Sequence, residues 1–140
     1  REHLLAGRCI VLHGPEPAEI YVPASWQEIE TALHYELDYV GRHLHECPDY
    51  CILNLCRLIH SFETRDVVVS KAPASDWAHK ALPEWQQHID LARKSYARRA
   101  TEQDRRFMLA EVGKFLEFVF MPFPFSGFIG FPVAFLVFLS

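Results

Sequence analysis

Two histidines and two cysteines lie within nine residues of one another and could together bind zinc. They are His43, His45, Cys47 and Cys51. Steps of four residues would place three of them on one face of a continuous helix, but Pro48 argues against such a helix. No second ligand pair follows at the spacing of a zinc finger. We therefore interpret the cysteines as buried thiols and the histidines as helix-end residues, and we expect no metal site.

Two pairs of carboxylates lie two residues apart in a region of helical periodicity. They are Glu28 with Glu30 and Glu36 with Asp38. Side chains two positions apart on a helix diverge by about 200°, so neither pair can chelate one metal ion well. We expect both pairs to lie on a solvated helix face.

Lys71 and Tyr96 are two residues whose positions could serve a ligand. A lysine at the start of a helix opposes the helix dipole, yet beside free backbone N–H groups it can help to hold a phosphate. Tyr96 continues the apolar stripe of its helix, and its ring or hydroxyl could face a ligand between helices. The simpler alternatives are a solvent-exposed lysine and a half-buried core tyrosine with a solvated hydroxyl. Spacing alone favours the exposed lysine and does not decide the role of Tyr96.

Motifs of nucleophilic and nucleotide-binding enzymes are absent from the sequence. It contains neither the G-x-S-x-G of a serine hydrolase nor a recognisable Cys–His family signature. A phosphate-binding P-loop and the G-x-G-x-x-G of dinucleotide-binding proteins are also missing. We therefore assign no catalytic residue to this chain.

Hydrophobic periodicity predicts a mainly α chain, with one short strand followed by a bundle of about five helices. The run of branched apolar residues in Arg8–His13 predicts the strand, and Ala18–Pro23 is expected to be extended. A capping box of Ser25 and Glu28 begins the first long helix, whose apolar stripe continues for about 20 residues.

Prolines and capping residues separate the remaining helices. Asp49 is a plausible N-cap of the second helix. In that helix Tyr50–Phe62 is apolar on nearly every side, so it should be central and buried. The expected third to fifth helices are Lys71–Ala81 capped by Ser70, a helix after Leu82-Pro83 with a stripe from Trp85 to Tyr96, and a helix begun by Thr101 and Asp104.

The charges are confined to the first 117 residues. All 32 Asp, Glu, Lys and Arg residues lie in Arg1–Glu117, whereas the last 23 residues carry none and hold 8 of the 19 aromatic side chains, all Phe. A net charge of −4 argues against non-specific binding of nucleic acid. Four cysteines in a chain of this kind suit a reducing compartment, so we expect a cytoplasmic location, and we expect a monomer.

The order and spacing of several short sequence motifs, taken together, are specific enough to indicate a protein family. They are CILNLCRLIHSFET at 51–64, VVSKAPASDWA at 68–78 and LP-W…ARKSY at 82–96, preceded by LHGPEPAEIY at 12–21. Over roughly residues 8–117 the chain resembles the C-terminal helical domain of aminoglycoside adenylyltransferases, the streptomycin- and spectinomycin-modifying nucleotidyltransferases. The N-terminal string is similar to the last strand and exit loop of the same family's catalytic domain.

The resemblance implies an antibiotic-resistance enzyme that transfers AMP from ATP to a hydroxyl group of an aminoglycoside, with Mg²⁺ as cofactor. The family's lysine that contacts the ATP phosphates matches Lys71, and its tyrosine that helps to form the nucleotide site matches Tyr96. Acidic residues that contact the drug precede the second long helix, where this chain has Glu46 and Asp49 without a clear register. The expected partners are thus ATP and an aminoglycoside.

The family's catalytic domain is mostly missing from the sequence. There is no Gly-Ser followed by Asp-x-Asp, so the metal-binding carboxylates are absent, and the catalytic base of the same domain is absent with them. We expect residues 1–24 to be a remnant of that domain and residues 25–117 to form the helical substrate-binding domain. We expect a truncated form that is inactive by itself, because phosphoryl-type transfer depends on metal ions.

Residues 118–140 form an apolar tail, rich in Phe and Pro, that the family does not predict. Its 23 uncharged residues are long enough to span a bilayer, but three prolines and two glycines interrupt any helix. We favour a C-terminus that is out of frame or otherwise foreign to the family; a membrane anchor and a flap packed on the helical domain are the alternatives. A second functional class stays open: a non-enzymatic helical interaction module, tethered to a membrane through this tail.

Overall fold

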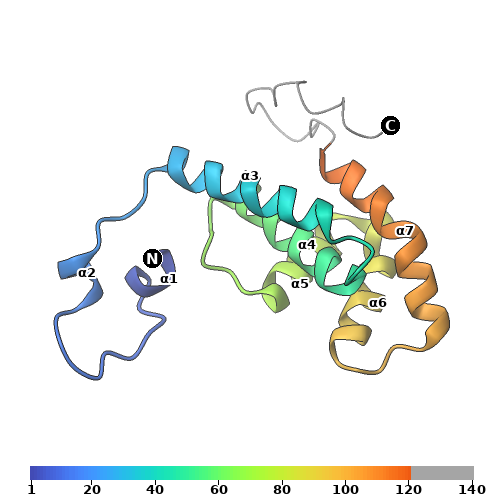
Figure 1. Ribbon diagram of the computed structural model, residues 1–140, viewed down its shortest axis with the longest axis horizontal. Coiled ribbons are helices and arrows are strands. Elements are labelled where there is room, and N and C mark those ends of the chain that lie inside the picture. The colour runs from blue at the N-terminus through green and yellow to red at the C-terminus, as the bar shows by residue number, and fades with distance from the viewer. Residues whose placement is uncertain (121–140) are drawn as a thin grey trace.

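The computed structural model describes residues 1–120, which form helices joined by short connections (Figure 1). The helices are α1 (Glu2–Leu5), α2 (Pro17–Ile20), α3 (Trp26–Arg42), α4 (Pro48–Thr64), α5 (Lys71–Ala81), the 3₁₀ helix η1 (Pro83–Trp85), α6 (Gln86–Tyr96) and α7 (Glu102–Phe120). The prediction of a mainly α fold is confirmed, and the five longer helices, α3 to α7, correspond to the five that the periodicity predicts.

The prediction of a strand at Arg8–His13 is wrong. No strand occurs in the part of the chain that the structure describes, and Ile10 and Leu12 are 86% and 92% exposed. A strand is stable when a neighbouring strand pairs with its backbone and its apolar face is covered. Residues 1–120 offer no such neighbour, so the β-propensity of this run is not realised.

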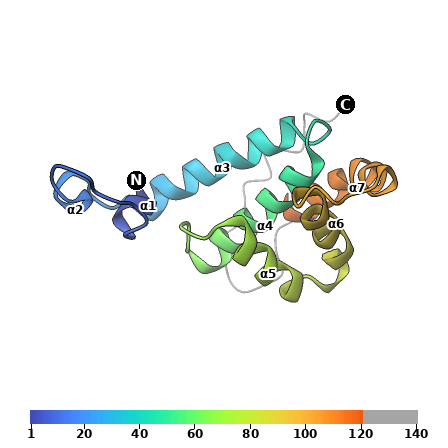
Figure 2. The ribbon, with the colours of Figure 1, turned by 90° about the horizontal axis from the view of Figure 1, so that it is seen from below.

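The segment before α3 holds two single-turn helices that lie beside one another, to one side of the helical body (Figures 1 and 2). The prediction of an extended Ala18–Pro23 is wrong for the first half of that segment, because Pro17–Ile20 form α2. Glu16 and Glu19 stabilise this turn, since the side chain of each accepts a hydrogen bond from the backbone N–H of the other. A reciprocal cap thus outweighs the weak extended preference of the segment.

The N-terminus of α3 forms as its sequence predicts. The Ser25 hydroxyl accepts a hydrogen bond from the backbone N–H of Glu28 at 3.3 Å, and the Glu28 carboxylate accepts one from the Ser25 N–H at 2.8 Å. The apolar stripe of the helix buries Leu37 and Val40 in the core that it shares with α4. Because both capping groups belong to its own first turn, α3 begins without help from the residues that precede it.

Helix α4 is the centre of the fold, with α3, α5, α6 and α7 packed around it (Figures 1 and 2). The prediction that this helix is buried on nearly every side is confirmed. Its buried residues are Cys51, Ile52, Leu53, Asn54, Leu55, Cys56, Leu58, Ile59 and Ser61. Burial of a Leu or Ile side chain contributes roughly 1.5–3 kcal/mol, so α4 supplies much of the stability of the core.

The sequence places the N-cap of α4 at Asp49, and this is wrong. The cap residue is Cys47, and Pro48 occupies the first helical position. Proline is favoured there because its fixed φ suits a helix and its missing N–H breaks no intrahelical bond. Asp49 instead lies in the first turn, where a negative charge interacts well with the positive end of the helix dipole.

The corner between α5 and α6 is built on Trp85. Leu82 and Pro83 end α5 as predicted, and the chain makes one turn of 3₁₀ helix before α6 begins. The Trp85 ring centre lies 4.8 Å from that of Phe115 and 5.3 Å from that of Phe118, both in α7. The corner is therefore held by aromatic packing against the last helix.

Helix α7 begins at the predicted capping box and continues past the predicted domain end. The Thr101 hydroxyl accepts from the Asp104 N–H at 3.2 Å, and the Asp104 carboxylate accepts from the Thr101 N–H at 2.7 Å. Phe118 to Phe120 belong to the helix, and Val119 is buried. The rest of the predicted tail lies outside the described residues. Among those described, no helix is long and apolar enough to cross a membrane.

A histidine is buried between α6 and α7. His88 is 8% exposed, and neither of its ring nitrogens has a hydrogen-bond partner among residues 1–120. Its neighbours are the rings of Trp85 and Phe107 and the carboxylate of Glu111, which lies 3.8 Å from Nε2. Burial lowers the pKa of His88, and the attraction of Glu111 opposes this shift only in part. The ring is therefore neutral at neutral pH.

Truncation of a side chain in the centre of α4 should destabilise the whole helical body. We expect Leu55→Ala, at a position that is 0% exposed, to lower the free energy of unfolding by about 2–5 kcal/mol, because it leaves a cavity. Urea denaturation followed by circular dichroism measures the change. Ile10→Ala is the matched control, with an expected change within about 0.5 kcal/mol. Equal losses in both variants would contradict this description of the core.

Stability should depend on pH through His88. Its pKa is lower in the folded than in the unfolded chain, so the free energy of unfolding should fall as the pH drops from about 6.5 toward the lowered pKa. Above about pH 6.5 this contribution is fully present. Urea titrations at about pH 7.5 and about pH 5.5 measure the fall. It should shrink in His88→Phe; an unchanged fall would show that other groups cause it.

Candidate functional site

Lys71 lies at the start of α5, where three helices meet. Its ammonium nitrogen lies 3.8 Å from the centre of the Tyr50 ring of α4 and 5.9 Å from the centre of the Tyr96 ring at the end of α6. A cation within about 6 Å of a ring centre is attracted to the face of that ring. The structure thus brings together Lys71 and Tyr96, which the sequence singles out, and adds Tyr50; we call these three residues the lysine–tyrosine cluster.

The surroundings of Lys71 disfavour its positive charge. Burial is the main cause that lowers the pKa of Lys71, and repulsion by Arg57 adds to it. The carboxylates of Glu36 and Asp49 act in the opposite direction but do not cancel the shift. Burial and the negative charge of Glu36 also raise the pKa of the Tyr50 hydroxyl. An anion bound beside Lys71 would offset the repulsion by Arg57, so the electrostatics favour a negatively charged ligand.

Glu36 of α3 contacts α4, so the prediction of a solvated carboxylate is wrong at this position. Its Oε1 accepts a hydrogen bond from Nδ2 of the buried Asn54 at 2.5 Å and lies 3.5 Å from the Arg57 guanidinium. Asp38, by contrast, is exposed and pairs with Arg42 one turn further along α3. The periodicity of α3 alone does not reveal that α4 presents polar partners to one of the two carboxylates.

Tyr96 is the last residue of α6, and its side chain is open to solvent. The residue is 63% exposed, which rules out the alternative of a half-buried core tyrosine. Its ring is attracted to Lys71 and leaves most of its surface free. An exposed aromatic ring beside a cation can stack on a planar ligand such as a nucleic-acid base.

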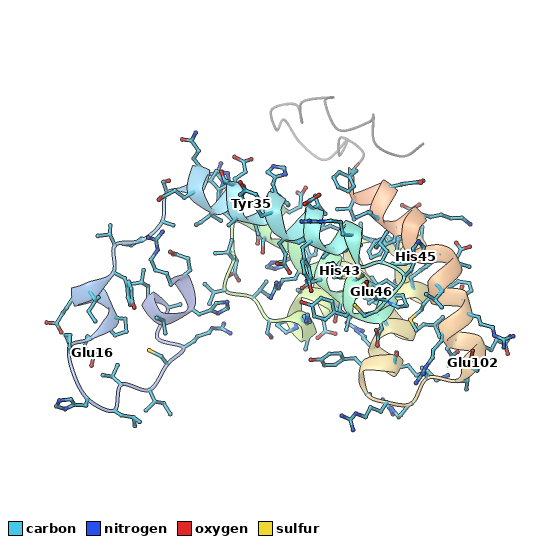
Figure 3. All side chains as sticks on the ribbon, in the orientation of Figure 1. Glu16, Tyr35, His43, His45, Glu46 and Glu102 are labelled. Carbon is cyan, nitrogen blue, oxygen red and sulfur yellow. The ribbon has the colours of Figure 1, made fainter. Side chains whose placement is uncertain are left out.

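The two acidic residues predicted near a drug lie close together in the chain but in different surroundings. Glu46 is exposed on the turn between α3 and α4, in the same turn as His43 and His45 (Figure 3). Asp49 is half-buried, and both of its oxygens accept hydrogen bonds: Oδ2 from the Ser95 hydroxyl at 2.7 Å and Oδ1 from the Tyr50 backbone N–H at 2.8 Å. Asp49 is therefore committed to bonds within the protein.

Two cysteines near this turn, Cys47 at the N-cap of α4 and Cys51 in its first turns, make hydrogen bonds to the backbone. The thiols of Cys47 and Cys51 both donate to the carbonyl oxygen of His43, at 3.8 and 3.5 Å. Burial raises the pKa of the Cys51 thiol to about 12, so this thiol stays protonated and unreactive. Among residues 1–120, no group of three or more His, Cys, Asp or Glu side chains is placed to hold a metal ion.

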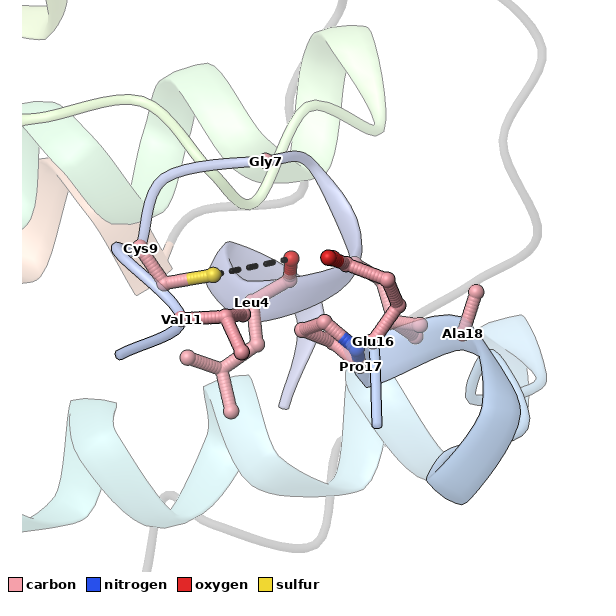
Figure 4. A pocket seen from close by; sticks show the side chains of 8 residues that line it. Leu4, Gly7, Cys9, Val11, Glu16, Pro17 and Ala18 are labelled. Carbon is pink, nitrogen blue, oxygen red and sulfur yellow. Dashed lines mark hydrogen bonds between the residues drawn. The ribbon is translucent and has the colours of Figure 1, made fainter. Parts of the chain in front are cut away.

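An open hollow of about 410 Å³ lies in the N-terminal segment, next to α1 and α2 (Figure 4). The Cys9 thiol donates to the carbonyl oxygen of Leu4 at 3.8 Å, and Val11 and Pro17 add apolar surface to the lining. Glu16 is the one acidic residue of the lining. A single carboxylate and a single thiol at an open surface do not indicate a particular ligand or reaction, so we assign no function to this hollow.

Sequence reasoning overlooked Tyr50 and Arg57. Together with Asn54 they occupy positions i, i+4 and i+7 of α4, which lie along one stripe of a helix. A single polar stripe on a helix that is otherwise apolar all round indicates that this stripe meets polar partners, and this signal was available in the sequence. Ser95 gives no such signal, because its partner Asp49 is 46 residues away in the chain.

The fold and the cluster define a helical domain that presents a lysine and two tyrosines where three helices meet. Residues 19–121 match the protein family described as aminoglycoside adenylyltransferase, C-terminal domain. Because this range covers most of the chain, the chain belongs to that family, and the resemblance seen in its sequence is confirmed. Comparison with curated proteins and with solved structures gives no match.

Proposed function

We propose that the helical body of this chain binds ATP and a streptomycin- or spectinomycin-type antibiotic, as part of an adenylyltransferase that transfers AMP to a hydroxyl of the drug. The observation that carries the proposal is the position of the Lys71 ammonium, 3.8 and 5.9 Å from the ring centres of Tyr50 and Tyr96. Membership of the family supplies the class of reaction.

Lys71 supports the phosphate end of the proposed nucleotide site. It is the first residue of α5, where the backbone N–H groups of the first turn lack intrahelical partners and the helix dipole is positive. Its ammonium group is partly desolvated and experiences repulsion from Arg57. A triphosphate would give the Lys71 ammonium group a partner of opposite charge, with the short, charge-assisted bonds that phosphate oxygens form.

Tyr96 supports the nucleoside end of the site. Its exposed ring lies at the end of α6, on the same cluster as the ammonium group that would hold the phosphates. Base stacking on an aromatic ring tolerates different bases, because every base has a π-face. Tyr50 has a different role, because Lys71 covers the face of its ring at 3.8 Å. This contact holds the ammonium group in place. We propose that Tyr96 contacts the base and that Tyr50 holds Lys71.

The acidic character of the chain supports a cationic second ligand. The net charge is −4, and aminoglycosides carry several amino groups that are protonated at neutral pH. Glu46 is exposed on the turn that precedes α4, three residues before Asp49. We propose Glu46 as a contact for an amino group of the drug.

Mg²⁺, which the family's reaction requires, does not fit the described residues of this chain. Mg²⁺ prefers carboxylate and phosphate oxygens, and residues 1–120 bring no suitable set of ligand side chains together. We assign no metal-dependent step to them. Their proposed share of the reaction is to bind and orient the nucleotide and the drug, which lowers the entropic part of the barrier.

Removal of the Lys71 ammonium group should weaken nucleotide binding. We expect Lys71→Ala to raise the dissociation constant for ATP about 10-fold or more, because a hydrogen bond to a charged group is worth about 1.5–3 kcal/mol. Isothermal titration calorimetry on the full chain measures this constant. Lys80→Ala is the matched control, since Lys80 is exposed in the last turn of the same helix and should leave the affinity unchanged. Equal affinities of Lys71→Ala and the parent chain would contradict the proposed role.

This chain by itself should not transfer AMP. Its sequence contains no Gly-Ser followed by Asp-x-Asp, and metal ions held by such carboxylates stabilise the charge that develops in the transition state. An assay with ATP, Mg²⁺ and spectinomycin, read by mass spectrometry of the drug, should yield no adenylylated product above a protein-free control. Measurable turnover would refute the proposed restriction of these residues to binding.

A further inference from the structure

We infer that Asp49 is a positioning residue, which holds Tyr50 and Tyr96 around Lys71 and does not contact the drug. Its carboxylate bridges the start of α4 and the end of α6, the two elements that carry the two rings. The inference rests on the proposed nucleotide site and deepens it, because it names the residue that fixes the geometry of that site.

Each oxygen of the Asp49 carboxylate is bonded next to one of the two rings. Oδ1 accepts from the backbone N–H of Tyr50 itself at 2.8 Å, in the first turn of α4. Oδ2 accepts from the hydroxyl of Ser95 at 2.7 Å, and Ser95 directly precedes Tyr96. Hydrogen bonds to a carboxylate are shorter and stronger than neutral ones. One side chain therefore ties the chain at Tyr50 and at Tyr96 to the same group.

The end of α6 is held by a second bond, to α7. The Lys94 ammonium donates to Oδ2 of Asp104 at 2.6 Å, and the same carboxylate caps α7 through the Thr101 N–H. The bonds from Lys94 and Thr101 lower the pKa of Asp104 to about 2, so this pair stays ionised at neutral pH. In addition to the packing of α6 against α4, the bond between Asp49 and Ser95 links the start of α4 to the end of α6 directly beside Tyr96.

This tether matters because Tyr96 stands at a helix end and is exposed. Terminal residues of helices fray, and a ring that is 63% exposed has little packing to restrict it. A ring that must be ordered when a ligand binds reduces the affinity, whereas a ring already in place does not. Loss of the Ser95 hydroxyl should therefore weaken ATP binding although Lys71 itself is unchanged.

The variants Ser95→Ala and Ser95→Thr test the inference, because alanine removes the hydroxyl and threonine keeps it. One readout is the nuclear Overhauser effect between the Lys71 ε-methylene and the Tyr96 ring protons; the other is the dissociation constant for ATP, measured by calorimetry on the full chain. We expect Ser95→Ala to lose the Overhauser effect and to bind ATP about three- to tenfold more weakly, the worth of one hydrogen bond. Ser95→Thr should match the parent chain in both.

Asp49→Ala supplies an independent variant at the other end of the bond. It should lose the Overhauser effect between Lys71 and Tyr96 as Ser95→Ala does, and the double variant should bind ATP no more weakly than Asp49→Ala alone, because both changes remove the same bond. Circular dichroism and thermal unfolding establish that each variant is folded.

A retained Overhauser effect in Ser95→Ala would overturn the inference, and so would an affinity for ATP equal to that of the parent chain. A lower melting temperature with the Overhauser effect retained would make the bond merely structural, which overturns it as well. If the parent chain does not bind ATP, the proposed function fails, while the Overhauser effect still decides whether the Asp49–Ser95 bond positions the Tyr96 ring.

Discussion

The enclosure of α4 by four other helices constrains the rest of the molecule. A polar side chain on such a helix must find partners, since an unpaired buried polar group costs about 1–3 kcal/mol. Tyr50, Asn54 and Arg57 interrupt the apolar surface of α4 along one stripe, and their partners come from neighbouring helices: Glu36 from α3 and Lys71 from α5. The lysine–tyrosine cluster is thus a direct result of a central helix that carries a polar stripe.

The parts of the fold that could be predicted from the sequence are those with local causes. The Ser25 and Glu28 capping box and the apolar character of α4 depend on residues within one or two turns, and both predictions are confirmed. The strand prediction at Arg8–His13 failed because pairing is not a local property. Among the site residues, Lys71 was identified through its match to the family. The hydrogen bond between Asp49 and Ser95 joins two helices and cannot be inferred from the spacing of residues in the sequence.

The charges in and around the cluster are balanced in two different ways. Arg57 lies beside a carboxylate, Glu36, at 3.5 Å, whereas the ammonium group of Lys71 faces aromatic rings. A cation–π contact contributes less than a desolvated ion pair with good geometry and leaves the donor hydrogens of the ammonium group without a strong acceptor. An anion can therefore bind Lys71 without displacing a carboxylate, which is consistent with the proposed nucleotide site.

The self-contained start of α3 makes the fold of the helical body independent of the segment that precedes it. Its capping groups lie at its own N-terminus, and the buried core is formed by α3 to α7 together with residues of the α3–α4 and α5–α6 connections. Substitution, insertion or fusion ahead of Ser25 leaves every one of those buried side chains with its neighbours. The fold of the helical body therefore does not depend on which residues precede Ser25.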